Sequence, residues 1–517
     1  MLGKIVFLAL LIIMMLVPSK HALHMFQQNR YELKRYTKWL KANIKIKPLL
    51  VGLVLLVIYY LTPLRNIRLC DVVAGLLAIY SISKEEKKEY IKPLVYTARV
   101  IRQIIVLVIV DLLVLVLLIN LLSDHLMIVV YLAYVMNWVL IYVMAIITAP
   151  VENFVQKGFI NDAKKILRSY DNLTIVGITG SYGKTSSKNI LQAILSDKFR
   201  SLMTPASFNT PMGVTITIRE HLKPTHQIFI CEMGADKVND IQFLCDFVHP
   251  KIGLVTSIGP QHLNTFGSIE NIINEKMKMI ENLPSDGLGV INVDNEYIRN
   301  YHVKNNCQLV TYGIYHDADY QACDIVYSPK GSKFNVLYDG VKYPFETKLL
   351  GEHNIMNILA AIAIARYLGV DFDKLASSVK NVQYVEHRLE VKKINGYTFI
   401  DNAFNSNPSG ASMSLKVMSM MPNKRFIVTP GLIDLGDKQD EVNKDLGKQM
   451  KDQVDVVILV GPIQTKAIYE GLSESGFDMN NVYVTKTVKE AFALVYQLAD
   501  TKDTILLEND LPDAFNV

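Results

Sequence analysis

Residues 173–187 read L-T-I-V-G-I-T-G-S-Y-G-K-T-S-S, an apolar, β-branched run followed by a glycine-rich turn and the start of a helical pattern. This order predicts a strand, a loop and a helix whose first N–H groups cradle phosphate oxygens. Lys184 would add a positive charge, and Thr185 would offer a hydroxyl to Mg²⁺. The residues expected to bind the nucleotide here are Gly180, Ser181, Gly183, Lys184, Thr185 and Ser186. The segment therefore predicts that the chain uses ATP.

The glycine spacing differs from the general phosphate-loop pattern, G-x-x-x-x-G-K-[ST]. That pattern would place its first glycine at 178, where this chain has Ile178, and the glycines stand at 177, 180 and 183. The alternative interpretation is a glycine-rich strand-to-helix turn with a surface lysine. The apolar run before the turn and the helical pattern after it favour the phosphate site.

The first 150 residues are strongly apolar. The chain has 517 residues, which predicts two or three domains, and 50% of them are hydrophobic. Two of the apolar runs are long enough to cross a bilayer core of about 30 Å, and the others are shorter but flanked by charge. We predict a transmembrane region over residues 1–150 with five helices, at 4–18, 48–63, 69–83, 103–122 and 126–148.

The charges between these runs predict an orientation. Many Lys and Arg residues separate the first run from the second and the third from the fourth, whereas the alternate loops carry few. By the positive-inside rule the basic loops are cytoplasmic, so the N-terminus lies outside the cell membrane and everything after residue 150 lies in the cytoplasm. The alternative for the first run is a cleaved signal peptide, although no small-x-small site follows it. Asp111, inside the fourth run, indicates either a functional site or a hydrogen bond to a neighbouring helix.

Cysteines and net charge narrow the function classes. The five cysteines are odd in number and far apart, which argues against a disulfide framework or a zinc site. The net charge of +5 comes largely from the loops that flank the apolar runs. It suggests contact with anionic membrane lipid and gives no support for nucleic-acid binding.

From about residue 170 onward, apolar runs alternate with helical patterns, which is typical of parallel sheets wrapped by helices. The expected strands are 173–178, 227–231, 252–256 and 289–293 in one series, and 397–401, 425–429, 456–460, 481–484 and 504–507 in another. The predicted fold class is an N-terminal α-helical membrane region followed by two α/β domains with mostly parallel, doubly wound sheets. The expected boundaries are 1–150 for the membrane region, 151–169 for a linker, 170–384 for a central ATP-binding domain and 385–517 for a Rossmann-like C-terminal domain.

Two polar residues follow predicted strands at the sheet edge where such folds bind ligands. Glu232 ends the run in I-C-E-M-G-A and is suited to hold Mg²⁺, with helix capping as the alternative. His262 follows the next run in G-P-Q-H-L. A neutral imidazole there could contact a second metal ion, although a lone histidine is more often a satisfied polar residue.

Seven further motifs follow the phosphate loop in order, and together they resemble the Mur ligase family of ATP-dependent amide-bond enzymes of peptidoglycan synthesis. They are F-N-T-P-M-G-V (208–214), E-M-G-A (232–235), G-P-Q-H-L (259–263) with F-G-S (266–268), N-V-D-N (292–295), G-E-H-N-I-M-N (351–357), E-H-R (386–388) and D-N-A-F-N-S-N-P (401–408). The resemblance spans roughly 170–517. Within the family the chain is most similar to the branch that joins D-alanyl-D-alanine to UDP-N-acetylmuramoyl-tripeptide.

The resemblance implies a role for each matching residue. Lys184 and Thr185 would bind the β- and γ-phosphates and a first Mg²⁺, and Glu232 would complete the coordination shell of that ion. His262 would bind a second Mg²⁺. The family also has a lysine carbamylated by CO₂ near this ion, and counting from His262 places it at Lys276, with Lys278 as the alternative. The implied catalytic set is Lys184, Glu232, His262 and Lys276. The implied adenine contacts are His353, Asn354 and Asn357, the ATP contacts from the C-terminal domain are Arg388 and Asp401, and the substrate contacts are Asn209, Thr210, Asn405 and Asn407.

Two regions depart from the family pattern. Membrane helices stand in place of the usual UDP-binding domain, so a muramoyl-peptide acceptor could be UDP-linked or lipid-linked. The segment E-N-D-L-P-D (508–513) stands where the family has a lysine- and serine-bearing loop, which leaves open whether the amine is an amino acid or a dipeptide. The alternatives are an amino-acid polymer synthetase of the poly-γ-glutamate type and a nucleotide-binding regulatory module of a membrane protein.

Overall fold

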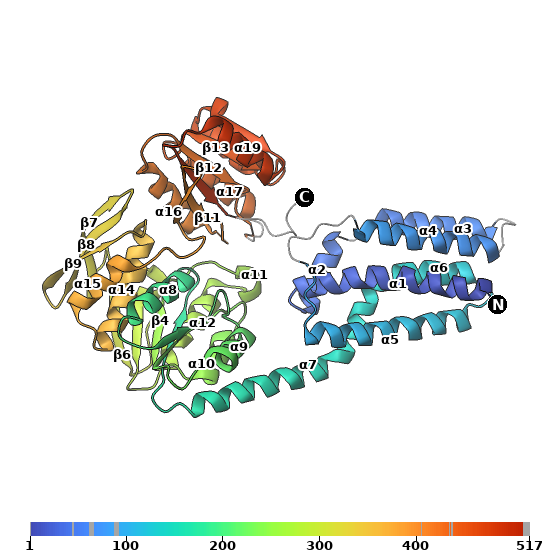
Figure 1. Ribbon diagram of the computed structural model, residues 1–517, viewed down its shortest axis with the longest axis horizontal. Helices are drawn as coiled ribbons and strands as arrows, with labels where there is room; N and C mark the ends of the chain where they lie inside the picture. The colour runs from blue at the N-terminus through green and yellow to red at the C-terminus, as the bar shows by residue number, and fades with distance from the viewer. Residues whose placement is uncertain are drawn as a thin grey trace. The chain divides into compact units, whose positions relative to one another are not determined.

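The computed structural model describes residues 2–43, 46–61, 67–86, 93–404, 406–433, 435 and 438–509. The chain divides into two compact units, Met1–Gly158 and Phe159–Val517 (Figure 1). Asn405, one of the residues expected to contact substrate, lies outside the described residues.

The first unit is a bundle of apolar helices. Three helices in the described part of the chain are long and apolar enough to cross a membrane, over Ile5–Gln28, Ala98–Leu121 and Asn137–Arg168. Shorter apolar helices cover Gly52–Leu61, Leu69–Ser83 and Leu126–Val135. The elements are α1 (Leu2–Gln28), α2 (Leu33–Asn43), α3 (Ile46–Leu61), α4 (Ile67–Glu86), α5 (Ala98–Leu121), α6 (Leu126–Val135) and α7 (Asn137–Arg168).

The bundle differs from the five helices predicted. The predicted span 126–148 is broken at Met136 into α6 and α7. Asn137 explains the break, because its Nδ2 donates to the carbonyls of Ala133 (3.2 Å) and Tyr134 (2.8 Å) and so competes with the helical ladder. The first helix runs well past the predicted residue 18, α2 was not predicted, and much of the segment expected to be a linker belongs to α7.

A polar contact joins three helices inside the bundle. The Oγ of Ser19 in α1 lies 3.0 Å from Asp111 Oδ2 in α5 and 3.2 Å from Asn137 Oδ1 in α7. All three side chains are buried. Of the two interpretations of Asp111, the structure therefore supports a hydrogen bond to a neighbouring helix.

Elsewhere in the bundle, Arg102 pairs with Glu152 through two contacts of 2.7 and 2.8 Å.

The second unit begins with a nine-stranded mixed sheet in the order β2-β3-β1-β4-β5-β6-β7-β8-β9. Its strands are β1 (Thr174–Thr179), β2 (Ser201–Met203), β3 (Ile228–Glu232), β4 (Ile252–Val255), β5 (Leu288–Asn292), β6 (Gln308–Gly313), β7 (Tyr320–Ser328), β8 (Gly331–Tyr338) and β9 (Val341–Thr347). All pairings up to β6–β7 are parallel, and β7–β8 and β8–β9 are antiparallel.

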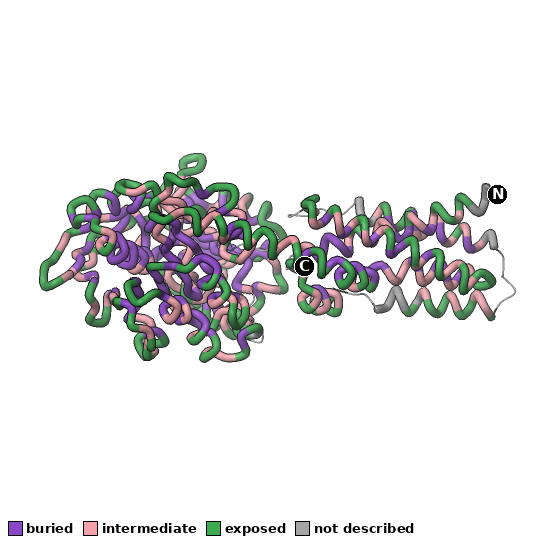
Figure 2. Tube along the Cα trace, turned by 90° about the horizontal axis from the view of Figure 1, so that it is seen from below, coloured by how far each residue is buried: buried purple, intermediate pink, exposed green. Residues whose placement is uncertain are grey.

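Helices cover both faces of this sheet, which explains why its central strands are apolar throughout. Val176 and Ile178 of β1 pack in one core with α8 (Lys184–Leu195), α14 (Glu352–Tyr367) and α15 (Phe372–Asn381). Ile175 points to the opposite core, because side chains alternate along a strand. That core contains α9 (Pro211–His221), α10 (Asp240–Val248) and α12 (Ile269–Glu281), and the short helices are α11 (Leu263–Phe266) and α13 (Glu296–Arg299). In Figure 2 the buried residues of this unit lie beneath an exposed outer layer.

The chain order places several loops at one edge of the sheet. β1 lies between β3 and β4, so the chain fills one side of β1 and then crosses to the other. The loops that follow β1, β3 and β4 therefore meet at the carboxyl ends of these strands. This switch point is where open α/β sheets bind ligands.

The antiparallel strands β7–β9 were not predicted. They alternate exposed and buried residues and are joined by short turns, as at Asp339–Gly340 between β8 and β9. Such half-exposed strands lack the continuous apolar runs by which the central strands were found.

A six-stranded sheet of order β10-β11-β15-β12-β13-β14 completes the unit. Its strands are β10 (Glu390–Ile394), β11 (Tyr397–Asn402), β12 (Arg425–Thr429), β13 (Val456–Val460), β14 (Val482–Thr485) and β15 (Thr504–Glu508). Only the β10–β11 pairing is antiparallel among those described, and β10 was not predicted. The helices are α16 (Pro408–Ser419), α17 (Gln439–Gln449), α18 (Lys466–Ser475) and α19 (Val488–Leu498). Both sheets are mixed but mostly parallel, as expected, and among the described strands the antiparallel pairings are β7–β8, β8–β9 and β10–β11.

Candidate active site

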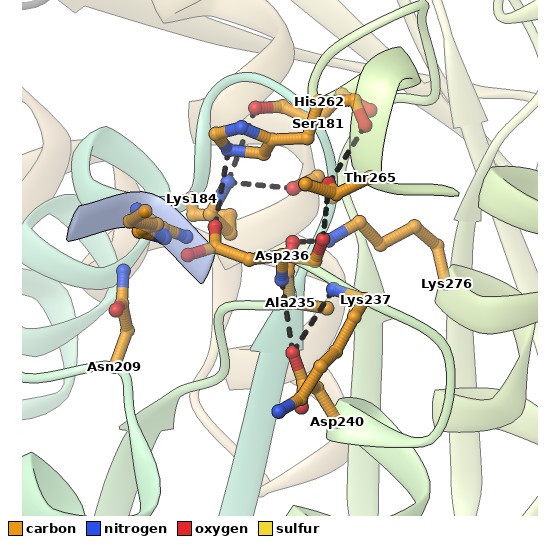
Figure 3. Close-up of polar contacts among 12 residues, drawn as sticks. Ser181, Lys184, Asn209, Ala235, Asp236, Lys237, Asp240, His262, Thr265 and Lys276 are labelled. Carbon is orange, nitrogen blue, oxygen red and sulfur yellow. Dashed lines mark hydrogen bonds and ion pairs between the residues drawn. The ribbon is translucent and has the colours of Figure 1, made fainter. Parts of the chain in front are cut away.

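The glycine-rich segment forms a tight loop between β1 and α8. Gly180 has φ +150° and Gly183 has φ +83°, and a Cβ at Gly180 would lie 2.1 Å from Thr256 Oγ1. Only glycine fits this backbone and this close approach. Lys184 folds back so that its Nζ donates to the carbonyls of Gly180 (2.6 Å) and Ser181 (3.1 Å) (Figure 3). Burial lowers the pKa of Lys184. This geometry suits the binding of a phosphate chain.

The loop after β4 supports the phosphate loop. The N–H of Ser181 donates to the Ser257 carbonyl at 2.6 Å, and the Ser181 hydroxyl donates to the Gly259 carbonyl at 3.0 Å. Thr256 Oγ1 donates to the carbonyl of Tyr182 at 2.5 Å. These bonds hold the phosphate loop on a rigid strand end, as a preorganised anion site requires.

Glu232, at the end of β3, faces the start of α8. Its Oε1 accepts hydrogen bonds from Thr185 Oγ1 (3.2 Å) and Asn209 Nδ2 (3.0 Å), and its Oε2 lies 3.0 Å from Lys188 Nζ. The structure therefore brings three predicted residues together: Thr185, Asn209 and Glu232. Thr210, by contrast, caps α9 by accepting a bond from the N–H of Gly213 at 3.3 Å.

The donor set around Glu232 fits a magnesium ion. A hydroxyl and a carboxylate oxygen are hard ligands, which Mg²⁺ prefers, and it usually takes one or two carboxylates plus phosphate oxygens. Glu232 is only 1% exposed, and burying a carboxylate is costly unless cations or hydrogen-bond donors lie beside it. The phosphate loop beside Glu232 is suited to hold the phosphate whose oxygens would be further ligands of the ion.

His262 and Lys276 lie beside the segment that follows β3. His262, at the start of α11, has its Nε2 3.3 Å from Asp236 Oδ1. Figure 3 shows the His262 ring and the Asp236 carboxylate next to the loop that carries Lys184. Lys276 enters from α12, with its Nζ 3.5 Å from the carbonyl of Ala235. The Asp240 carboxylate accepts the N–H groups of Asp236 (3.0 Å) and Lys237 (3.1 Å), which fixes this segment.

The two candidate lysines on α12 have different environments. Lys276 is 3% exposed, and burial, assisted by the charge of Lys184, lowers its pKa to about 7. Lys278 instead bonds Asn239 Oδ1 (2.8 Å) and Glu275 Oε2 (3.0 Å). A lysine with a pKa near 7 is neutral in about half of the molecules at neutral pH, and the neutral amine is a nucleophile. The environment favours Lys276 over Lys278 as the reactive residue.

The residues expected to contact adenine lie at the start of α14. The Nδ1 of His353 is buried and has no hydrogen-bond partner among the described residues, and burial lowers the pKa of His353 to about 4. Asn357 Oδ1 accepts a bond from Ser187 Oγ at 2.9 Å, which links α14 to the phosphate-loop helix. Asn354 Nδ2 donates to the Leu350 carbonyl at 2.8 Å. Their roles toward adenine stay predictions.

Asp401 and Arg388 lie at the start of the C-terminal sheet. Asp401 Oδ2 is 2.7 Å from His387 Nδ1 and 2.7 Å from Lys392 Nζ. Burial alone would raise the pKa of Asp401, but hydrogen bonds from Lys392 and His387 hold it below its usual value. Burial lowers the pKa of Arg388, and the negative charges of Glu232 and Glu508 partly offset this by raising it. The ammonium of Lys392 occupies the space among Asp401, Glu390 and His387, so we assign no metal there.

The loop after β11 is held by the end of β15. Asn407 caps α16 by accepting a bond from the N–H of Gly410 at 3.0 Å. Glu508 is fully buried and accepts hydrogen bonds from Asn402, Ser406 and Ser414. The segment that departs from the family pattern therefore begins with a buried carboxylate that organises this loop.

Three features of the site were missed by the sequence analysis. They are Asp236 beside His262, Lys188 beside Glu232, and Glu508 with Asn509 beneath the loop after β11. Asp236 follows E-M-G-A directly, and Lys188 is one helical turn beyond Lys184, so both were within reach of pattern reasoning. The sequence marked 508–513 only as a departure from the family pattern. It gave no signal that Glu508 is buried beneath the loop, because its partners are 106, 102 and 94 residues away in sequence.

Comparison with family models gives two matches. Residues 178–365 match the Mur ligase middle domain, and residues 387–508 match the Mur ligase, glutamate ligase domain. The UDP-N-acetylmuramoyl-tripeptide–D-alanyl-D-alanine ligase of Bacillus subtilis is 28% identical over 338 residues, which cover 65% of this chain and 72% of the relative. The ligase of the same name from Synechocystis is 30% identical over 282 residues, 54% of this chain and 60% of the relative.

A solved structure has the same fold in the second unit. The MurF ligase of Thermotoga maritima in complex with ADP superposes with a TM-score of 0.61 at 22% identity, covering 70% of this chain and 81% of the other. The alignment confirms the α/β fold of the two matched domains.

Proposed function

The chain belongs to the Mur ligase family of ATP-dependent, ADP-forming ligases, and on this premise we propose that it joins a muramoyl-peptide carboxylate to D-alanyl-D-alanine. The contact set of Lys184, Thr185 and Glu232 at the ends of β1 and β3 is the observation that carries the proposal. It combines a phosphate loop with a metal-binding carboxylate. Either alternative, a polymer synthetase or a regulatory module, would have to retain this site for another purpose.

The reaction needs an activated carboxylate. A carboxylate is a poor acyl donor at neutral pH, so its oxygen attacks the γ-phosphorus of ATP and ADP leaves, which gives an acyl phosphate. The neutral amine then attacks the acyl carbon, phosphate leaves and the amine loses a proton. No serine or cysteine nucleophile is needed. Positioning and charge neutralisation supply most of the rate enhancement.

The residues of the central domain divide this work. The phosphate loop and Lys184 bind and orient the phosphate chain, and Lys184 offsets its negative charge. Thr185 and Glu232 would hold a first Mg²⁺, and His262 a second. Bound Mg²⁺ neutralises phosphate charge and withdraws electron density from the γ-phosphorus. Asn209, which already touches Glu232, is assigned to the acceptor.

Lys276 is proposed to carry a carbamate. Its neutral amine attacks CO₂, a proton is lost, and the product is an anionic oxygen ligand in place of an ammonium. The low pKa of Lys276 supports this, since an ordinary lysine is almost fully protonated at neutral pH. Arg388 and Asp401 would contact ATP, and Asn405 and Asn407 the amine, when the C-terminal domain closes on the central one.

The helical bundle is proposed to anchor the enzyme in the cell membrane, with its N-terminus outside and the ligase domains in the cytoplasm. Three apolar helices of sufficient length and the basic loops support this topology. The acceptor is a muramoyl peptide, and its carrier is either UDP or a membrane lipid. An anchored enzyme would meet a lipid-linked acceptor by lateral diffusion in the plane of the membrane.

The proposal is tested with membranes that contain the full-length protein. They are incubated with ATP, Mg²⁺, labelled D-alanyl-D-alanine and muramoyl tripeptide linked either to UDP or to lipid, and products are identified by mass. We expect ADP, phosphate and a new amide in one arm, and the arm identifies the carrier. An amide formed only with another amino acid would reassign the amine. Successive addition of one amino acid would support a polymer synthetase, and ATP hydrolysis without any amide would support the regulatory module.

A further inference from the structure

Lys188 is a fully buried cation next to the phosphate site. Its side chain is 0% exposed. Its Nζ lies 3.0 Å from Glu232 Oε2 and donates to the carbonyl of Ala206 at 2.6 Å. Lysine is almost never fully buried unless it is paired, because desolvating a charge is costly. The burial of Lys188 is therefore compensated by two partners from two different segments, β3 and the loop before α9.

The contact with Lys188 uses one oxygen of Glu232 and leaves the other facing Thr185. Oε2 faces Lys188, while Oε1 faces Thr185 Oγ1 at 3.2 Å. An ion bound to Thr185 and Oε1 would replace the hydrogen bond between them and leave the contact with Lys188 intact. Lys188 thus fixes the rotation of the carboxylate, as an outer partner of a metal ligand does.

The second partner of Lys188 belongs to the loop that carries Asn209. Ala206 has φ +42°, an unusual conformation for a residue with a side chain, and its carbonyl accepts the bond from Lys188. The same loop is also bound to the last residue of β3 and to the segment that follows β3. Thr204 Oγ1 accepts a bond from the Glu232 N–H at 3.1 Å, and the Asn209 carbonyl accepts one from Gly234 at 2.8 Å. Lys188 completes this set of contacts from the side of α8.

We propose that Lys188 is a positioning residue. It fixes the orientation of the Glu232 carboxylate, a Mg²⁺ ligand, and the position of the loop 204–210. It touches neither phosphate nor acceptor, and it acts through Glu232 and through the Ala206 carbonyl. The inference rests on the proposed Mg²⁺ role of Glu232 and goes beyond it, because one buried ammonium then links the metal site to the segment assigned to the acceptor.

The test uses the detergent-solubilised full-length protein with ADP and Mg²⁺ only. ADP affinity is measured by calorimetry, once in EDTA and once in Mg²⁺. Lys188→Met keeps the length of the side chain and removes the charge. We expect the Mg²⁺-dependent gain in ADP affinity to fall by about tenfold or more, while the affinity in EDTA is unchanged. Lys251→Met is the control, since its ammonium pairs with Asp286 just before the start of β4, at the other end of the strand from the site, and it should behave as wild type.

A double-mutant cycle separates positioning from a purely structural role. If Lys188 acts on the metal through Glu232, then in a protein that already carries Glu232→Gln the substitution Lys188→Met should not change the Mg²⁺-dependent gain in ADP affinity any further. Hydrogen exchange over 204–210 should also become faster in Lys188→Met and stay unchanged in Lys251→Met. Additive effects of the two substitutions, or wild-type Mg²⁺ dependence in Lys188→Met, would overturn the proposal. So would loss of ADP affinity in EDTA, because it would assign Lys188 to the folding of α8.

These measurements do not depend on the identity of the acceptor or the amine. A ligase with other substrates would give the same Mg²⁺ and ADP results, whereas the product assay described above decides the substrates. The two proposals can therefore fail separately.

Discussion

Asn402 Nδ2 donates to both carboxylate oxygens of Glu508, at 3.1 and 3.0 Å, so the end of β11 is tied to the end of β15. The Ser414 hydroxyl reaches the same carboxylate at 2.5 Å, and burial raises the pKa of Glu508. Beside it, Asn509 accepts a bond from the Ser406 N–H (3.0 Å) and donates to the Gly431 carbonyl (2.7 Å). One dipeptide at the end of β15 thereby joins the loops after the two strands that flank it.

Glu508→Gln should loosen the loop after β11. The amide nitrogen of glutamine would meet hydroxyl and amide donors in place of an acceptor. The free energy of local opening of residues 402–414 should fall by about 1–2 kcal/mol, as measured by hydrogen exchange. The KM for the amine should rise while the KM for ATP is unchanged. Glu474→Gln, which removes an exposed carboxylate paired with Lys444 and Lys448, is the control, and equal effects in both variants would refute the assignment.

Lys184→Ala should abolish most ligase activity. Its ammonium is preorganised at the phosphate loop, and loss of one such charge-stabilising group costs about a hundredfold or more in kcat. Single-turnover release of phosphate measures the effect. Lys198→Ala is the control, because Lys198 bonds the Gly369 carbonyl on the outside of the same domain. Full activity in Lys184→Ala would contradict the proposed role of the loop.

Carbamylation of Lys276 should depend on pH in a defined direction. CO₂ reacts only with the neutral amine, and the pKa of Lys276 is about 7, so the reactive fraction rises as pH increases from 6 to 8. With ¹³C-bicarbonate, a carbamate signal should appear by NMR and grow over this range. The signal should be absent in Lys276→Ala and retained in Lys278→Ala. The reverse pattern would assign the carbamate to Lys278.

Asp401 should stabilise the C-terminal domain at neutral pH and not in acid. Its pKa is lower in the folded protein than the unfolded value of about 3.9, so the folded state binds fewer protons. The stabilisation is therefore complete above that value and is lost as pH falls through the folded pKa. Protection of β10 and β11 against hydrogen exchange should show this loss in wild type. Asp401→Asn should lower protection at neutral pH and flatten its dependence on pH.

The membrane topology can be tested with two introduced cysteines. Ser123 lies in the loop after α5, Ala42 lies near the end of α2, and both are exposed. In intact cells a membrane-impermeant maleimide should label Ser123→Cys, and it should label Ala42→Cys only after permeabilisation. The wild-type chain is the control, since four of its five cysteines are buried and Cys323 is partly buried. Labelling of Ala42→Cys in intact cells would invert the orientation.

The central strands and the phosphate loop could be predicted because their causes are local in sequence. Strands buried on both faces are continuous apolar runs, and a loop that binds phosphate needs glycines at fixed positions. The runs at 173–178, 227–231 and 252–256 correspond closely to β1, β3 and β4. The strands β7–β9 and β10 could not be found in this way, because many of their residues are partly or fully exposed and they therefore lack a continuous apolar run.

The sequence by itself determined which residues are available for chemistry: a lysine and a threonine after a glycine-rich turn, a carboxylate after an apolar run, and the order of the family motifs. Only the tertiary structure decided how they combine. The strand order puts β1 between β3 and β4, which brings Thr185 to Glu232 and buries Lys188 against the same carboxylate. Burial also distinguishes Lys276 from Lys278, and it makes Glu508 the centre of a hydrogen-bond network. Distances and desolvation act between groups far apart in the chain, so no local pattern encodes them.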